Sequence, residues 1–307
     1  MNHIIGIDVG GTNIKAGLVR KGRVLSKTNR HTRAEDGSRK CIEVIKAVIK
    51  SYINEASAIG IGIAGIIDSK KGIVRYSPNL KNWRNVELAK ILKGEFKKPV
   101  KILNDVNAIL LGEWVYGAGK GYKNIFLFTL GTGIGGAAIC EDKLLFGAHG
   151  FAGEFGHIII DFNGPKCLCG NYGCLERYVG SRYIVKLAKR RIRVKMSSLK
   201  NYYKELSPKI IADEAKKGDY VAKEVFKEIG YYIGIGVSSI INLFDPEIVI
   251  ISGGIAGAGR ILFEPIRKTV KQRILGAEYR RLKIIPAELG DDAGILGSAY
   301  FAQANFS

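Results

Sequence analysis

The chain has 307 residues, a formal net charge of +20 and an apolar content of 47%. No apolar run reaches the ~20 residues of a membrane-spanning helix, so a membrane protein is not expected. The N-terminus enters an apolar strand without a charged and apolar leader, which favours a cytoplasmic protein. Five cysteines, three of them clustered, indicate metal binding in a reducing compartment rather than a disulfide framework.

The strong positive charge suits a protein that binds nucleic acid or anionic nucleotides. The densest basic block runs from Arg182 to Lys204 and contains no acid. No recognised nucleic-acid motif accompanies it, so a solvated helix followed by a surface loop is the favoured interpretation. Its cations include Lys186, Lys189, Arg190, Arg191, Arg193, Lys195 and Lys200.

The first third of the chain predicts alternating strands and helices. Apolar runs separated by Gly10-Gly11 and Lys21-Gly22 predict three antiparallel strands, and later patterns predict further strands and two helices. The strands are expected over 4–9, 14–19, 23–26, 59–63, 73–76 and 100–103, and the helices over 41–52 and 86–96. Asp105 is expected to open another helix that Gly117 closes.

The second part of the chain repeats the pattern of the first. Residues 126–137 echo residues 5–17 as strand, glycine-threonine turn and strand, which predicts a duplicated α/β fold around a cleft. Two domains are expected, 1–116 with 291–307 and 117–290. Helices are predicted over 176–190, 208–217 and 221–244, followed by a strand over 248–251 and another helix. A last helix over 291–304, small and apolar on one face, should pack on the first domain.

Two glycine-threonine turns could cradle phosphate groups, because their backbone N–H groups are accessible. They are Asp8-Val9-Gly10-Gly11-Thr12 and Leu130-Gly131-Thr132-Gly133. Neither is a Walker or Rossmann sequence, and either alone reads more readily as an ordinary hairpin. Together, with Asp8 available to bind hydrated Mg²⁺, they predict a nucleotide cleft.

Asn104-Asp105 follows an apolar strand, at the edge of a sheet where α/β clefts open. A carboxylate there could accept the proton of a hydroxyl during phosphoryl transfer. The alternative is a helix N-cap, for which Asn and Asp are both preferred. The two roles are compatible.

A cysteine cluster predicts a structural zinc site in the loop 157–174. Three thiolates and one imidazole make a closed tetrahedral set, and Gly170 and Gly173 give the loop the freedom to turn around an ion. The alternative is a group of free, buried thiols. The expected ligands are His157, Cys167, Cys169 and Cys174.

These motifs, taken in order, resemble the ROK family (repressor, open reading frame, kinase) over nearly the whole chain. The resemblance rests on 8–17, 130–137, Glu154-x-x-His157, the cysteine loop through Glu176, and Ser252-Gly253-Gly254. It implies the two-domain actin and hexokinase ATPase fold, with duplicated ribonuclease H-like domains. It also places Gly10, Gly11, Thr12, Lys15, Gly131, Thr132 and Gly133 at the ATP phosphates and Gly253 and Gly254 near the adenosine.

The same resemblance implies a sugar site with Asp105 as the catalytic base. Taken alone, Glu154 and Glu176 read as surface charges, or for Glu176 a helix N-terminal residue, and Asn79 reads as a turn residue after Pro78. Trp83 could be a core residue or a sugar platform. The implied substrate-binding residues are Gly65, Asn79, Asn104, Asp105, Glu154, His157 and Glu176.

The predicted function is an ATP- and Mg²⁺-dependent kinase that phosphorylates the 6-hydroxyl of glucose or a related hexose. Residues 150–153 resemble the glucokinase-like form, while an N-acetylhexosamine, allose or broad-specificity kinase stays open. A sugar-responsive regulator would need a DNA-reading module, for which Met1-Asn2 leave no room before the first strand. A non-catalytic sensor conflicts with Asp8, Asp105 and both turns. The family resemblance suggests a homodimer or homotetramer.

Overall fold

The computed structural model describes residues 3–304, which form two compact units. Unit 1 contains residues 3–122, 143–152 and 288–304, and unit 2 contains residues 123–142 and 153–287. The expected division placed 117–122, 143–152 and 288–290 with the second domain, whereas all three segments belong to unit 1. None of the helices in the described part combines the length and apolar content that a membrane span requires.

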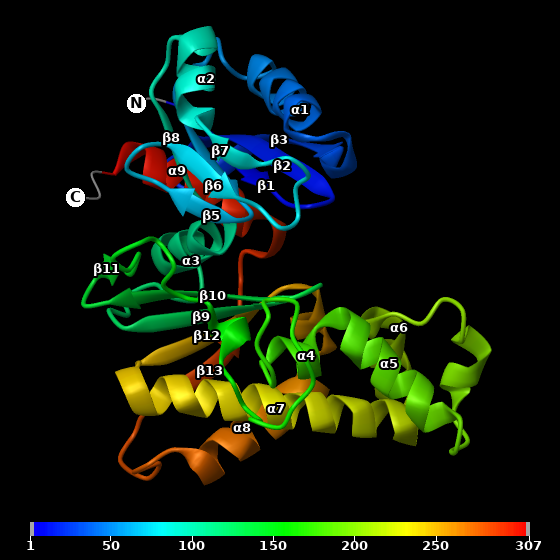
Figure 1. Cartoon of the computed structure of the whole chain (residues 1–307). Coiled ribbons are helices and arrows are strands. Elements are labelled where there is room, and N and C mark those ends of the chain that lie inside the picture. Colours follow the sequence, from blue (N-terminus) through cyan, green and yellow to red (C-terminus); the bar gives the residue numbers. More distant parts are fainter. Residues whose placement is uncertain (1–2, 305–307) are drawn as a thin grey trace. The chain divides into compact units, whose positions relative to one another are not determined.

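Unit 1 is built on a mixed sheet whose strands lie in the order β3-β2-β1-β4-β8. Figure 1 labels β1, β2, β3 and β8 of this sheet. The antiparallel meander β1 to β3 confirms the prediction, although β3 continues to His31 instead of ending near residue 26. β4 and β8 then add in parallel to β1. The bounds are β1 (His3–Val9), β2 (Asn13–Arg20), β3 (Arg23–His31), β4 (Ala56–Ile63) and β8 (Val100–Asn104).

Four helices and a small antiparallel sheet complete unit 1. Apolar residues of α1 and α2 are buried in one core with the strands of the large sheet. The helices are α1 (Ser38–Lys50), α2 (Leu88–Phe96), α3 (Asp105–Tyr116) and α9 (Ala293–Gln303), and the small sheet is β5 (Ile66–Asp68), β6 (Ile73–Tyr76) and β7 (Arg84–Val86). The short strand β11 (Lys143–Leu144) begins the segment 143–152.

Helix α9 packs within unit 1, against β1, β4 and α3, as predicted. The expectation of a single apolar face was wrong, because nearly every residue of α9 is buried. Close approach to the sheet explains this. A Cβ atom on Gly6 would overlap the carbonyl oxygen of Ile295, and one on Gly60 would overlap that of Ser298. The glycines of β1 and β4 therefore allow the backbone of α9 to pack directly against the backbone of the sheet.

A buried carboxylate holds two connecting segments of unit 1. Glu113 of α3 is fully buried, and its side chain accepts hydrogen bonds from the backbone N–H groups of Ala118 (3.0 Å) and Leu289 (2.8 Å). The N–H of Glu288 donates to the same carboxylate at 3.1 Å. A buried carboxylate with several N–H donors is well compensated, so Glu113 fixes the segment that leads into α9.

Unit 2 repeats the strand order and directions of unit 1, which confirms the predicted duplication. Its strands lie in the order β10-β9-β12-β13, matching β2-β1-β4-β8, with β9 and β10 antiparallel and β12 parallel to both neighbours. They are β9 (Ile125–Leu130), β10 (Ile134–Cys140), β12 (Ile248–Ser252) and β13 (Lys283–Pro286).

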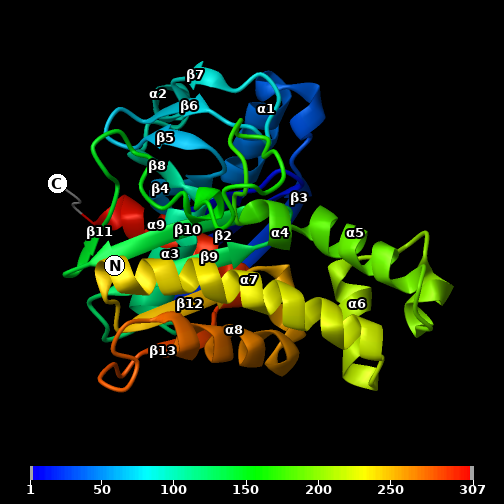
Figure 2. The ribbon, with the colours of Figure 1, turned by 60° about the horizontal axis from the view of Figure 1, so that its bottom comes forward.

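The helices of unit 2 follow the predicted positions with one difference. The expected single helix over 176–190 is two helices, α4 (Glu176–Val179) and α5 (Ser181–Ile192), because Gly180 between them has an extended backbone. The long helix α7 lies beside α8 (Figure 2). The other helices are α6 (Pro208–Lys217), α7 (Tyr220–Phe244) and α8 (Arg260–Arg273).

Candidate functional site

Three parallel strands of unit 1 bring chemically active residues to one edge of the sheet. In the strand register, Asp8 on β1 lies opposite Gly62 on β4, and Ile63 lies opposite Asn104 on β8. Carboxyl ends of parallel strands are where α/β proteins bind their ligands. Asp8 and the Asn104-Asp105 pair, predicted from separate motifs, therefore share one edge of this sheet.

Asn104 caps helix α3, as the alternative interpretation proposed. Its side-chain oxygen accepts hydrogen bonds from the N–H groups of Val106 (2.8 Å) and Asn107 (3.2 Å). Its amide nitrogen donates to the carbonyl oxygen of Gly65 at 3.0 Å. Asp105 is the first residue of the helix, where the helix dipole favours an ionised carboxylate. The capping role therefore belongs to Asn104, and Asp105 is not needed for it.

The carboxyl of Asp8 lies in an environment that opposes its ionisation. Burial raises its pKa most strongly, the nearby carboxylates Asp105 and Asp291 raise it further, and Lys15 opposes them; the resulting pKa is about 7. Lys15 faces Asp8 across β1 and β2, and its Nζ pairs with Asp291 at 2.6 Å. A carboxyl surrounded by other carboxyls has the chemistry that suits a divalent cation or its hydrated shell.

The first glycine-threonine turn is fixed by hydrogen bonds at Gly10 and is exposed at Gly11 and Thr12. The N–H of Gly10 donates to the carbonyl of Asn13 at 3.0 Å, and the hydroxyl of Thr32 donates to the carbonyl of Gly10 at 2.8 Å. Gly11 and Thr12 are exposed. This turn therefore has a fixed backbone and accessible residues, as a phosphate cradle needs.

The residues around Asn79 divide between surface and core. Asn79 is exposed, and a Cβ on Gly11 would lie 3.5 Å from the Asn79 Cβ, so the predicted sugar segment adjoins the first turn. Trp83 is only 1% exposed and packs in the core of unit 1. Of the two interpretations of Trp83, the core residue is therefore correct.

The second glycine-threonine turn, in unit 2, is also fixed by neighbouring groups. The N–H of Gly131 donates to the carbonyl of Gly133 at 3.0 Å, and the hydroxyl of Ser181 donates to the carbonyl of Gly131 at 2.6 Å. Ser252 on β12 lies opposite Thr129 on β9, so Gly253-Gly254 follow at the same edge of the sheet as this turn. The predicted phosphate and adenosine segments of unit 2 are therefore adjacent.

Glu176 contacts the second turn directly, which the sequence did not indicate. Its Oε2 accepts a hydrogen bond from the N–H of Ile134 at 3.0 Å, immediately after Gly133. Glu176 also begins helix α4 and follows the last cysteine of the loop by two residues. One carboxylate therefore joins the predicted phosphate turn to the cysteine loop.

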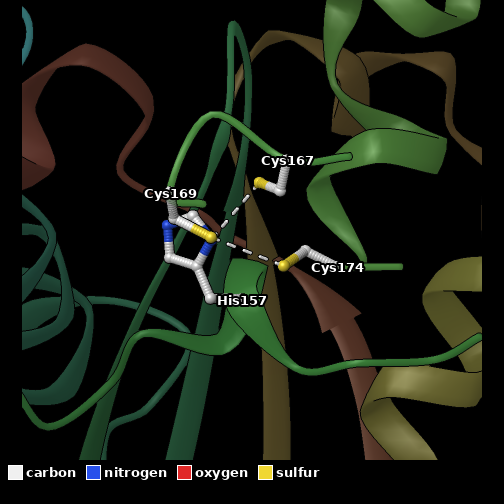
Figure 3. Close-up of side chains that lie close together, drawn as sticks. All are labelled: His157, Cys167, Cys169 and Cys174. Atoms are coloured by element: carbon white, nitrogen blue, oxygen red, sulfur yellow. Dashed lines mark hydrogen bonds between the residues drawn. The ribbon is translucent and has the colours of Figure 1, made fainter. Parts of the chain in front are cut away.

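The side chains of His157, Cys167, Cys169 and Cys174 point toward one another (Figure 3). Their ligand atoms all lie within 4.8 Å of one another. The Sγ atoms of Cys169 and Cys174 are 3.6 Å apart, and the Sγ of Cys167 is 3.8 Å from the Nδ1 of His157. Zn–S bonds of ~2.3 Å at tetrahedral angles hold two sulfurs about 3.8 Å apart, so the cluster fits a zinc ion.

The loop around this cluster depends on two glycines, as predicted. Gly170 has φ +101 and Gly173 has φ +68, values that favour glycine. The Nε2 of His157 lies 4.0 Å from the carboxylate of Glu154, while Nδ1 faces the sulfurs. The histidine therefore presents one nitrogen to the metal position and the other to an exposed carboxylate.

Several residues that shape the site escaped the sequence interpretation. Asp291 and Gly294 lie near Asp8 only because α9 returns to the first sheet. Thr32 and Ser181 hold the two turns through single hydroxyls. The acidic pair Asp291-Asp292 at the start of the last predicted helix was the one available signal, and it reads equally well as a helix N-terminus.

Comparison with known proteins gives consistent similarities over the whole chain. The sequence model of the ROK family matches residues 4–305. A glucokinase from Thermotoga maritima is 39% identical over 305 residues, covering 96% of each chain. A xylose repressor from Caldicellulosiruptor bescii is 35% identical over 306 residues, covering 96% of this chain and 76% of the repressor.

A solved structure is also similar over almost the full length of both chains. The ROK family glucokinase from Streptomyces griseus, crystallised with glucose and AMPPNP, has a TM-score of 0.86 at 35% identity. The match covers 98% of this chain and 99% of that one. This similarity confirms the predicted fold class.

Proposed function

Because this chain belongs to the ROK family, we propose that it is an ATP-dependent hexose kinase that phosphorylates the 6-hydroxyl, with glucose as the first substrate to test. The observation that carries the proposal is the shared sheet edge of unit 1, which holds Asp8, Asn104 and Asp105 behind an accessible glycine turn. The similarity to glucokinases, one of them crystallised with glucose and AMPPNP, supports the same reaction.

In the proposed reaction Asp105 accepts the proton of the 6-hydroxyl while the oxygen of that hydroxyl attacks the γ-phosphorus of ATP. The new O–P bond forms as the bond to the β-phosphate oxygen breaks, and ADP leaves. Backbone N–H groups of both glycine-threonine turns and Lys15 bind the phosphates, and Gly253-Gly254 adjoin the adenosine. Asp8 would hold Mg²⁺ through its hydration shell, and the ion would neutralise charge on the phosphates.

The hexose hydroxyls are bound in this proposal by carboxylates, amides and one imidazole. Asn104 is fixed by its hydrogen bonds to helix α3 and Gly65, and Glu176 by its bond to Ile134. Zinc on the cysteine cluster would be structural, since four protein ligands leave no position to activate water. The proposed sugar contacts are Gly65, Asn79, Asn104, Asp105, Glu154, His157 and Glu176.

A coupled assay of kcat/KM over a panel of hexoses tests the proposal and identifies the sugar. Glucose should give the highest kcat/KM. The proposal would be rejected if no hexose were phosphorylated from ATP.

A second candidate, a sugar-responsive regulator, is favoured by the similarity to a xylose repressor. It predicts a sugar-dependent shift of DNA that weakens with salt. The proposed assembly is a homodimer or homotetramer, which light scattering would distinguish.

The raised pKa of Asp8 predicts a pH-dependent stability. In metal-free buffer the folded state retains the Asp8 proton up to pH about 7, whereas the unfolded chain releases it near pH 3.8. Stability from this proton is therefore complete below pH 3.8 and is lost as the pH rises through 7. The slope for one proton is at most about 1.4 kcal/mol per pH unit.

Urea unfolding from pH 4 to pH 8, with and without Asp8→Asn, measures this contribution. The difference in unfolding free energy between wild type and Asp8→Asn should fall as the pH increases. A difference that is constant across this range would show that Asp8 ionises at its ordinary pKa.

A further inference from the structure

Unit 1 contains a cavity of about 760 Å³ that the proposed reaction does not use. Its walls are the β5–β6 hairpin, the first residues of β8, the end of α9 and the segment 146–151. Asp105 and both glycine-threonine turns are absent from its described lining. The volume is within the range of sites that bind small molecules, roughly 300–1,000 Å³.

The lining is strongly cationic. It includes Lys70, Lys71, Arg75 and Lys101, and the one acid among its described residues is Asp68. Asp68 is already engaged, because Arg75 donates to it at 2.7 Å and the backbone N–H of Lys71 donates at 3.0 Å. The cavity therefore has excess positive charge after its internal ion pair is counted.

The same cavity offers an aromatic surface. The rings of Phe146 and Phe301 lie 6.4 Å apart between centroids, and Phe151 is 52% exposed. Lys101 lies over the ring of Phe301 and donates to the carbonyl of Ala304 at 2.5 Å, which holds that part of the wall. Aromatic rings beside cations suit a ligand that has an apolar body and an anionic group.

The cavity is connected to the proposed catalytic residues by a short path within unit 1. Ile66 and Ile67 of β5 line the cavity, and the preceding residue, Gly65, accepts the hydrogen bond from Asn104. Asn104 in turn caps the helix that begins with Asp105. A ligand that shifts the start of β5 would therefore act on the Asn104 side chain and the position of Asp105.

We propose that this cavity is a regulatory site for a small aromatic or apolar anion, such as an organic phosphate or carboxylate. The proposal that the ligand regulates turnover rests on the proposed kinase function, whereas the proposal that the cavity binds such a ligand does not. A ligand there changes hexose turnover through Gly65 and Asn104. Differential affinity for two positions of β5 is the physical requirement for such an effect.

Isothermal titration with phenyl phosphate tests binding, with glucose and a non-hydrolysable ATP analogue present to fill the substrate sites. Two control ligands are titrated in the same way: inorganic phosphate, which has the anionic group without the ring, and benzyl alcohol, which has the ring without the anionic group. Phenyl phosphate should bind at least about tenfold more tightly than either. Equal affinity of inorganic phosphate, or no binding of phenyl phosphate, would overturn the proposal.

Variants of the lining locate the site. Lys71→Glu and Phe151→Ala, both of exposed residues, should each weaken phenyl phosphate about tenfold. Lys93→Glu, an equal charge change on an exposed lysine of α2 outside the lining, should change it less than about twofold. Unchanged binding in both lining variants would reject this location.

The regulatory part is tested by the rate of hexose phosphorylation with and without phenyl phosphate. Wild type should change its kcat or its KM for the hexose by about twofold or more, and Phe151→Ala should not respond. Binding that leaves both constants unchanged would reject regulation but keep the site. An enzyme that phosphorylates no hexose would reject the kinase proposal, while the titrations would still decide whether the site exists.

Discussion

Asp105→Asn is expected to bind hexose and ATP nearly as the wild type does and to lower kcat by about 10² to 10⁴-fold, the usual contribution of a general base. The amide has the size of the carboxylate but cannot accept the proton of the 6-hydroxyl. The fold should survive, because Asn104, not Asp105, caps helix α3 through Val106 and Asn107. Titration with glucose and single-turnover kinetics measure binding and chemistry separately.

A matched control is Asn104→Ala, which removes the cap and the hydrogen bond to Gly65. It should cost about 1 kcal/mol of stability, as the loss of an N-cap usually does. The unfolding midpoint should fall in Asn104→Ala, which loses the cap, and should not fall in Asp105→Asn, which keeps the cap and removes a carboxylate near Asp8. Near-normal kcat in Asp105→Asn would reject Asp105 as the base.

Cys169→Ser is expected to lose stoichiometric zinc, with a lower thermal unfolding temperature and little or no activity. Serine replaces a thiolate ligand in a four-residue set whose atoms lie within 4.8 Å. The cluster adjoins Glu176, which holds the second glycine-threonine turn through Ile134, so losing the metal should also disturb this turn. Metal analysis of the purified protein and a thermal scan measure the two losses.

Cys140→Ser is the matched control, because Cys140 is a free thiol on β10 outside the cluster. It should keep both zinc and activity. A Cys169→Ser protein that is fully active without metal would refute a zinc-dependent site. Full zinc content in both variants would instead show that bound zinc does not depend on this cluster.

Short sequence patterns were enough to predict features that depend only on neighbouring residues. The antiparallel pair β1 and β2, the cap before α3 and the glycines at Gly170 and Gly173 follow from residues close together in the sequence. The convergence of His157, Cys167, Cys169 and Cys174 was predictable because few other roles suit three thiols and an imidazole in one short loop.

Contacts between distant residues were not predictable in this way. Lys15 pairs with Asp291 across 276 residues, and Glu176 reaches Ile134 from another element. Each depends on how the sheets and helices pack, and charged residues at those positions read locally as surface groups. The break at Gly180 was also missed, because one glycine within an apolar periodic pattern is often tolerated in a helix.

The return of α9 to unit 1 has a consequence for how the chain is made. A ribosome synthesises the β1–β4–β8 part of unit 1 well before α9, whose backbone fills the space against Gly6 and Gly60. Until then Glu113 lacks the N–H donors of Glu288 and Leu289, and the apolar face that α9 covers has no partner. Unit 1 therefore completes its fold only after unit 2 has been synthesised, and nascent chains should be most sensitive to proteases and chaperones in that interval.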